Sequence, residues 1–75
     1  MTELPIVTPR QLIRARERFG FFVHHARGSH YYLKHPDRPA LRVTVPFHNR
    51  DIKRGTLRAI LREAGLTVEA LVGLL

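Results

Sequence analysis

Two runs of aromatic and β-branched residues, separated by one Arg-Gly pair, constrain the fold of this chain most. The first run is FFVHHA, residues 21–26, and the second is SHYYLKH, residues 29–35. A two-residue connection that contains glycine is typical of a tight β-hairpin, because glycine adopts the left-handed backbone conformation with little strain. We therefore predict a hairpin with Arg27 and Gly28 as its turn residues.

The register of this hairpin determines which side chains share a face of the sheet. The predicted cross-strand pairs are Ser29 with Ala26, His30 with His25, Tyr31 with His24, and Tyr32 with Val23. One face then carries His25, His30, Tyr32 and Lys34, and the other carries Phe22, His24, Ala26, Tyr31 and Leu33. A slip of one residue would exchange the two sets. We expect the face with His30 to be open to solvent.

A helix is expected before the hairpin and a third strand after it. Thr8 and Pro9 are typical of a helix start, and apolar residues at helical spacing predict a helix over residues 9–19, before Gly20. The PDRP stretch at 36–39 predicts a turn. It leads into ALRVTVP, residues 40–46, where apolar and polar residues alternate as in a strand with one buried face.

Two further helices are expected in the C-terminal part of the chain. Thr56 is predicted to cap a helix over residues 57–64, whose apolar stripe ends before Gly65. Thr67 is predicted to cap a short last helix over residues 68–75.

The order of these elements predicts an α+β fold, with a helix, three antiparallel strands, a second helix and a short tail helix. Both longer helices need a sheet surface to cover, so we expect them on one face of the sheet, with the other face open. A chain of 75 residues is too short for a second core. We expect residues 1–75 to form one domain, with residues 1–7 as an extended N-terminal arm.

The charge of the chain favours polyanionic partners. It carries 13 Lys and Arg against 6 Asp and Glu, for a net charge of +7 and an isoelectric point near 11.4. Such a balance favours nucleic acid or an acidic protein as a partner. There is no cysteine, which excludes disulfides and thiolate zinc sites. With no signal-like start and no apolar run of membrane-spanning length, we expect a cytoplasmic protein that does not enter a membrane.

His30 is a candidate general acid or base, because an unperturbed imidazole exchanges protons near neutral pH. RNA suits a site with few other groups, since its 2′-hydroxyl is a built-in nucleophile beside each phosphorus. Arg27, Lys34 or Arg42 could offset the phosphate charge, and Tyr32 could stack on a base. Taken alone, a histidine in a strand more often has an ordinary surface or core position than a catalytic one.

Several other features have both a functional and a structural interpretation. The histidines suggest a metal site, and they are His24, His25, His30, His35 and His48. Because adjacent residues of a regular strand point to opposite faces, His24 and His25 should not bind one ion, and we expect neither a metal nor a small-molecule cofactor. His48 is a weaker second candidate for proton transfer. Phe21 and Phe22 fit packing better than base stacking.

Two basic series fit either a phosphate backbone or a solvated helix face. The first comprises Arg10, Arg14, Arg16 and Arg18. The second comprises Arg50, Lys53, Arg54, Arg58 and Arg62.

Four ordered motifs resemble the HicA (YcfA-like) toxin family, over nearly everything after about Leu12. They are Gly20-Phe21, Gly28-Ser29-His30, Val45-Pro46-Phe47-His48 and Ile52-Lys53-Arg54-Gly55-Thr56-Leu57-Arg58-Ala59-Ile60-Leu61. Two departures are the seven or so extra residues before the first helix and Arg54, where the family often has proline. Neither departure affects the motif around His30.

The resemblance implies an α-β-β-β-α fold like that of double-stranded-RNA-binding domains. It further implies a ribosome-independent ribonuclease, an mRNA interferase of a type II toxin–antitoxin system, that is silenced by a HicB antitoxin bound over its active site. The family's catalytic histidine corresponds to His30. We expect RNA contacts from Arg27, Gly28, Ser29, Tyr32, Lys34 and Arg42.

Three functional hypotheses follow from the sequence. The first is a metal-independent endoribonuclease toxin that cleaves mRNA with one catalytic histidine, His30. The second is a non-catalytic RNA-binding module of the same fold, in which the basic and aromatic surface only holds RNA. The third is a protein-interaction domain whose positive charge serves an acidic partner.

Overall fold

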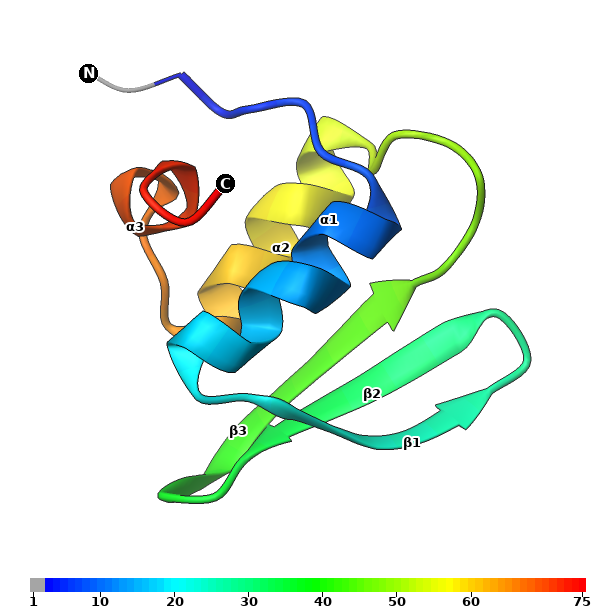
Figure 1. Ribbon diagram of the computed structural model, residues 1–75, viewed down its shortest axis with the longest axis vertical. Helices are drawn as coiled ribbons and strands as arrows, with labels where there is room; N and C mark the ends of the chain where they lie inside the picture. Colours follow the sequence, from blue (N-terminus) through cyan, green and yellow to red (C-terminus); the bar gives the residue numbers. More distant parts are fainter. Residues whose placement is uncertain (1–2) are drawn as a thin grey trace.

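The computed structural model describes residues 3–75 as helices at both ends of the chain and a β-sheet between them (Figure 1). The elements in chain order are α1 (Pro9–Ala15), a 3₁₀ turn (Arg16–Phe19), β1 (Phe22–Arg27), β2 (His30–His35), β3 (Arg38–Pro46), α2 (Arg54–Ala64) and α3 (Val68–Val72). The predicted α+β order is therefore confirmed.

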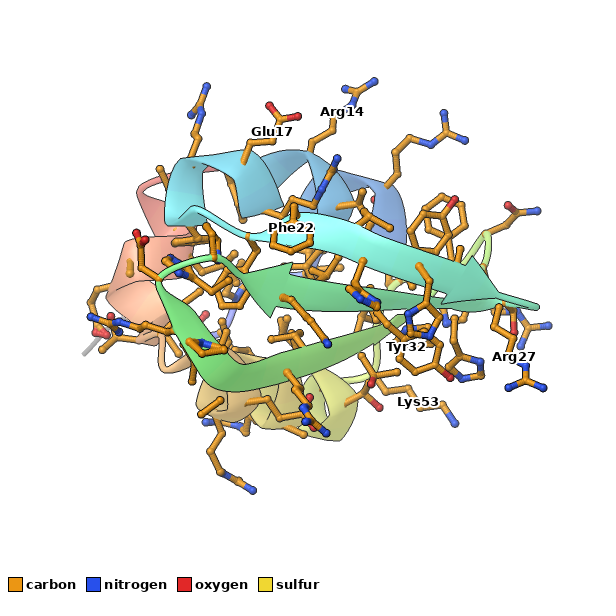
Figure 2. All side chains as sticks on the ribbon, turned by 90° about the horizontal axis from the view of Figure 1, so that it is seen from below. Arg14, Glu17, Phe22, Arg27, Tyr32 and Lys53 are labelled. Carbon is orange, nitrogen blue, oxygen red and sulfur yellow. The ribbon has the colours of Figure 1, made fainter. Side chains whose placement is uncertain are left out.

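The three strands form one antiparallel sheet in the order β1-β2-β3. Both α1 and α2 lie on the same side of this sheet, and α3 packs beside them (Figure 1). No helix covers the other side among the described residues 3–75, as the view from below shows (Figure 2). The sheet thus has one face in the core and one open face.

The helix termini follow the capping rules in most places. Thr8 caps α1 through a capping box with Gln11, and the Thr67 hydroxyl accepts a hydrogen bond from the Ala70 N–H at the start of α3. Gly20 and Gly65 end their helical segments with φ of 86° and 71°. These predictions are confirmed.

Several predicted boundaries are wrong, and α3 ends at Val72 rather than at residue 75. The helix α2 begins at Arg54 rather than after Thr56, because the Leu57 N–H already bonds the Lys53 carbonyl at 2.8 Å. Gly55 lowers the stability of the helix too little to prevent the first turn from including it. The turn after β2 is also shorter than PDRP, because only Pro36 and Asp37 form it and β3 starts at Arg38.

The hairpin turn lies one residue later than predicted. Gly28 and Ser29 form it, and Arg27 pairs with His30. Gly28 has φ of 58° and Ser29 has no positive φ, a pattern typical of a turn with glycine in its first position. The predicted turn would have required arginine at that first position, where a Cβ is strained. This is the physical reason for the error.

The error in the turn leaves the predicted faces of β2 unchanged. Moving a two-residue turn by one position changes each partner by two residues, and side chains two apart in a strand share a face. His25 consequently faces Tyr32 instead of His30, and His25, His30, Tyr32 and Lys34 still lie on one side. The prediction that His30 is exposed on the open face is confirmed.

A β-bulge in β1 changes the face of the residues that precede it. Val23 pairs with Leu33 and His25 with Tyr32, so His24 is the extra residue. As a result Val23 packs against the core, while Phe22, which we expected in the core, pairs with Lys34 and remains 43% exposed. His24 is exposed as well. The predicted core positions of Phe22 and His24 are therefore wrong.

The core lies between the sheet and the two longer helices. Its members from the sheet include Leu33, Val43 and Val45, and the largest fully buried side chains are Leu57, Leu71, Val7, Val45 and Pro9. The segment before α1 contributes Leu4 and Val7, and the Val7 carbonyl accepts a 2.8 Å hydrogen bond from the Ile52 N–H. Residues 3–7 are thus packed on the same core as the sheet.

Candidate functional site

The open face of the sheet gathers His30 and most of the RNA-contact residues that the sequence predicts. Its side chains, placed by the strand register, are Phe22, His25, Arg27, His30, Tyr32, Lys34, Arg42, Thr44 and Pro46. Three of them are permanent cations and none carries a negative charge. This face therefore has the charge and the shape to receive an extended anionic chain.

His30 lies at the hairpin end of the open face. It is the first residue of β2, between Arg27 of β1 and Pro46 of β3. The Phe47 N–H donates a 2.6 Å hydrogen bond to the Ser29 carbonyl, and the Phe47 ring packs 4.8 Å from the Tyr31 ring on the other side of the sheet. These contacts fix the backbone under His30 while its imidazole stays exposed.

Next to His30, the open face is hollowed into a depression of about 440 Å³. Its polar lining comes from all three strands and consists of His25, Arg27, Tyr32, Lys34, Arg42 and Thr44. Four of the six predicted RNA contacts, Arg27, Tyr32, Lys34 and Arg42, are brought together there. Gly28 and Ser29 lie outside it, in the turn beside His30.

Stacked rings fill one side of this depression. The His25 ring lies 4.4 Å from the Tyr32 ring at 13°, which is a stacked arrangement, and the His30 ring is 6.4 Å from Tyr32 at 34°. Tyr32 is only partly exposed as a result. Figure 2 shows Tyr32 and Arg27 towards the hairpin end, whereas Arg14 extends away from the sheet on α1.

His24 and His25 contact each other, although we expected them to point to opposite faces of a regular strand. Because the bulge breaks the strand alternation, both rings lie together, with their Nδ1 atoms 2.8 Å apart. The ammonium of Lys34 lowers the pKa of His24, and desolvation and the nearby His25 act in the same direction. Predicting this pair would have required predicting the bulge, and a bulge has no clear sequence signature.

The remaining histidines have local structural partners. The Nδ1 atom of His48 accepts a hydrogen bond from the Arg50 N–H, and this ring lines a different depression from His25. The His35 ring packs edge-on against Phe21 and its Nδ1 accepts from the Asp37 N–H. Within residues 3–75 no three histidine or acidic side chains come together in a way that would hold a metal ion.

The two basic series lie on the helices and their connections. Most of these side chains are exposed, but Arg16 is partly buried and donates to the Ile13 carbonyl. The structure therefore gives Arg16 a packing role, and the others remain compatible with either interpretation.

The fold and the site define a class of small, basic α+β proteins whose candidate site lies on the uncovered face of a three-stranded sheet. A sequence model for the HicA toxins of bacterial toxin–antitoxin systems matches residues 9–66. The chain belongs to this family, which confirms the resemblance drawn from the four motifs. A comparison with curated proteins finds no match.

Family membership makes the chain a toxin of a toxin–antitoxin system, and a toxin of this kind is paired with a cognate antitoxin. None of the helices formed by residues 3–75 is long and apolar enough to cross a membrane.

Proposed function

We propose that this toxin is a cytoplasmic, metal-independent endoribonuclease that cleaves mRNA, with His30 as a general acid/base. The observation that carries this proposal is the position of His30. Its exposed imidazole lies on the open face beside Arg27, which lines the depression together with Lys34 and Arg42. Cleavage at a ribonucleotide phosphate needs proton transfer and positive charge, and His30 lies at the end of a cation-lined depression.

Because the RNA supplies its own nucleophile, the protein needs to supply only proton transfer and positive charge. The 2′-hydroxyl of the RNA attacks the adjacent phosphorus, forming the O2′–P bond as the P–O5′ bond breaks. One proton leaves the 2′-hydroxyl and one is delivered to the departing 5′-oxygen, so the products are a 2′,3′-cyclic phosphate and a 5′-hydroxyl. Cationic side chains offset the negative charge that builds on the phosphorane oxygens.

The predicted RNA contacts divide into three roles. Arg27, Lys34 and Arg42 supply charge to the phosphates, and Tyr32 supplies ring surface for a base. Gly28 and Ser29 shape the turn that presents His30. A Cβ at Gly28 would meet no atom within 4 Å, so lack of space does not require glycine at this position. Its positive φ does.

We further propose a HicB-like antitoxin that covers the open face. Charge complementarity with the cations around the depression requires an acidic contact surface on this partner. We expect the toxin to copurify with the product of an adjacent gene. We expect this binding to be lost when Arg27 and Arg42 are changed to Glu. A neighbouring gene product that neither binds the toxin nor relieves its toxicity would contradict this partner.

A His30→Ala variant tests the catalytic role. We expect this variant to keep the circular dichroism spectrum and melting temperature of the parent, yet to stop arresting growth and to stop cutting RNA in EDTA. The matched control is His48→Asn, whose Oδ1 atom can replace the Nδ1 acceptor for the Arg50 N–H. Equal toxicity of His30→Ala and the parent would show that the role is assigned wrongly.

A non-catalytic RNA-binding module is the second candidate. The cation-lined depression and the stacked rings of His25 and Tyr32 are sufficient for binding alone. Incubation of the purified chain with end-labelled RNA separates the two functions, since a shift in mobility without new fragments would favour the module.

A further inference from the structure

The proposed cleavage moves two protons, and His30 accounts for one of them. A second group must work at the opposite oxygen of the same phosphate. The other histidines near this face are His25, which lies on it, and His24, whose ring contacts His25. The partner of His30 is therefore to be sought in this pair.

His25 is placed to share one phosphate with His30. It pairs directly with Tyr32, and His30 lies two residues before Tyr32 on the same face of β2. Such diagonal neighbours are about 7–8 Å apart across a sheet. A group at the 2′-oxygen and a group at the 5′-oxygen must also stand several ångströms apart, because each makes its own hydrogen bond on opposite sides of the phosphorus.

Two contacts hold the His25 ring in one orientation. One ring face is stacked on Tyr32, at 4.4 Å and 13°, and the Nδ1 atom is 2.8 Å from Nδ1 of His24. The remaining ring nitrogen, Nε2, takes part in neither contact. A catalytic imidazole is commonly oriented in this way, with one nitrogen tied to a fixed partner and the other left to react.

In the contact between the two Nδ1 atoms, one ring donates its N–H and the other accepts. Lys34 lowers the pKa of His24 and so favours its neutral form, which carries a lone pair. We assign the shared proton to His25, because this tautomer leaves a lone pair on the Nε2 atom of neutral His25. Since His24 is neutral rather than anionic, it orients His25 without attracting a second proton to it.

We infer that His25 is the general base of the cleavage, that His24 is the positioning residue that fixes its tautomer, and that His30 is the general acid. This inference rests on the proposed ribonuclease function. The Nε2 atom of His25 takes the 2′-hydroxyl proton, and protonated His30 gives its proton to the 5′-oxygen. After product release, His25 returns its proton to solvent and His30 regains one.

The charged and titratable groups around His25 lie on all three strands: His24 and Arg27 on β1, His30, Tyr32 and Lys34 on β2, and Arg42 on β3. The cations Arg27, Lys34 and Arg42 attract a phosphate to the depression that His25 also lines. Proton abstraction by His25 is thus coupled to a correctly placed phosphate.

The experiment measures single-turnover cleavage, in EDTA, of a short RNA that the wild type cuts. We expect His25→Asn, which keeps a donor at the Nδ1 position but has nothing at Nε2, to lose at least about 10²-fold in rate. We expect the wild-type rate to fall at acidic pH as the general base is protonated, and His25→Asn to lose this fall. His24→Asn should retain most of the rate, because its Oδ1 can accept from His25, while His24→Ala should be clearly slower.

A second substrate separates the base from the acid. When sulfur replaces the 5′-oxygen at the cleaved position, the leaving group needs no proton. We expect this substrate to restore cleavage by His30→Ala and not by His25→Asn.

Three outcomes are decisive. A wild-type chain that does not cut RNA would remove both the proposed function and this inference. Cleavage that needs His30 but is unchanged in His25→Asn would overturn the inference alone. Rescue of His25→Asn by the sulfur substrate would reverse the assigned roles and also contradict it.

Discussion

The imidazole of His25 lies flat against the phenol ring of Tyr32, with centroids 4.4 Å apart and planes inclined by 13°. This contact joins β1 to β2 on the open face and places a second imidazole near His30. It exists because the turn is Gly28-Ser29, which puts His25 opposite Tyr32. A local choice of turn residues therefore determines the composition of the candidate site.

Gly20 should be the glycine least tolerant of substitution. It has φ of 86°, and a Cβ there would lie 2.7 Å from Nε2 of His35. Gly65 has φ of 71° with open space around it, so it is a matched control for the backbone strain alone. We expect Gly65→Ala to cost about 1–2 kcal/mol of unfolding free energy in urea and Gly20→Ala clearly more. Equal losses would show that the His35 ring imposes no constraint.

Leu71 should anchor α3 to the core. This side chain is fully buried, whereas its neighbour Val72 is 40% exposed. We expect Leu71→Ala to lower the unfolding free energy by about 2–5 kcal/mol and Val72→Ala by well under 1 kcal/mol. Urea denaturation followed by circular dichroism measures both. Similar small losses would mean that α3, which lies beyond the family match, contributes nothing to the fold.

The salt dependence of RNA binding should distinguish cations on the open face from those on the helices. Arg42 lines the depression, while Arg62 is exposed on α2, behind the sheet. We expect Arg42→Gln to weaken RNA binding and to reduce the slope of log K against log salt by about 0.7. Arg62→Gln should leave the slope unchanged. Fluorescence anisotropy at several salt concentrations, with His30→Ala in both variants to prevent cleavage, provides the measurement.

His24 should make the stability of the fold depend on pH. Its pKa lies below the ordinary value of 6.5, chiefly because of Lys34, so the unfolded chain binds more protons at this residue than the folded chain. The contribution of neutral His24 is therefore present above about pH 6.5 and is lost as the pH falls through the lowered pKa.

We expect the unfolding free energy of His24→Asn, relative to the parent, to increase between pH 7.5 and pH 5. The histidines that do not contact His24, which are His30, His35 and His48, have the same surroundings in both proteins and cancel in the difference. A difference that stays constant with pH would contradict the effect of Lys34 on His24.

The sequence predicts the helices and strands well because their signals are local. Thr8 with Pro9, Gly20 and Gly65 mark ends by their own chemistry, and the structure uses each of them in that way. The predicted start of α2 was wrong because a threonine near a helix start has the sequence signature of an N-cap. Thr56 has this signature although the helix has already begun before it. The contact that decides this, from the Leu57 N–H to the Lys53 carbonyl, has no side-chain signature.

The site is predictable only in part, because a bulge depends on how two strands fit together. His30, Tyr32 and Lys34 share a face by simple alternation, and the sequence predicts this without the correct turn. The pair formed by His24 and His25 depends on one unpaired residue in β1, which alternation excludes. The same bulge moves Phe22 out of the core. Packing of Val23 against Leu33 and its neighbours offers a physical reason for this position.

The central claim is that His30 on the open face cleaves RNA through the 2′-hydroxyl. The most direct test is mass spectrometry of the fragment ends that the purified chain produces from RNA in EDTA. We predict 2′,3′-cyclic phosphate or 3′-phosphate ends together with 5′-hydroxyl ends, and no fragments from His30→Ala. Fragments with 3′-hydroxyl and 5′-phosphate ends, or the same fragments from His30→Ala, would contradict the account.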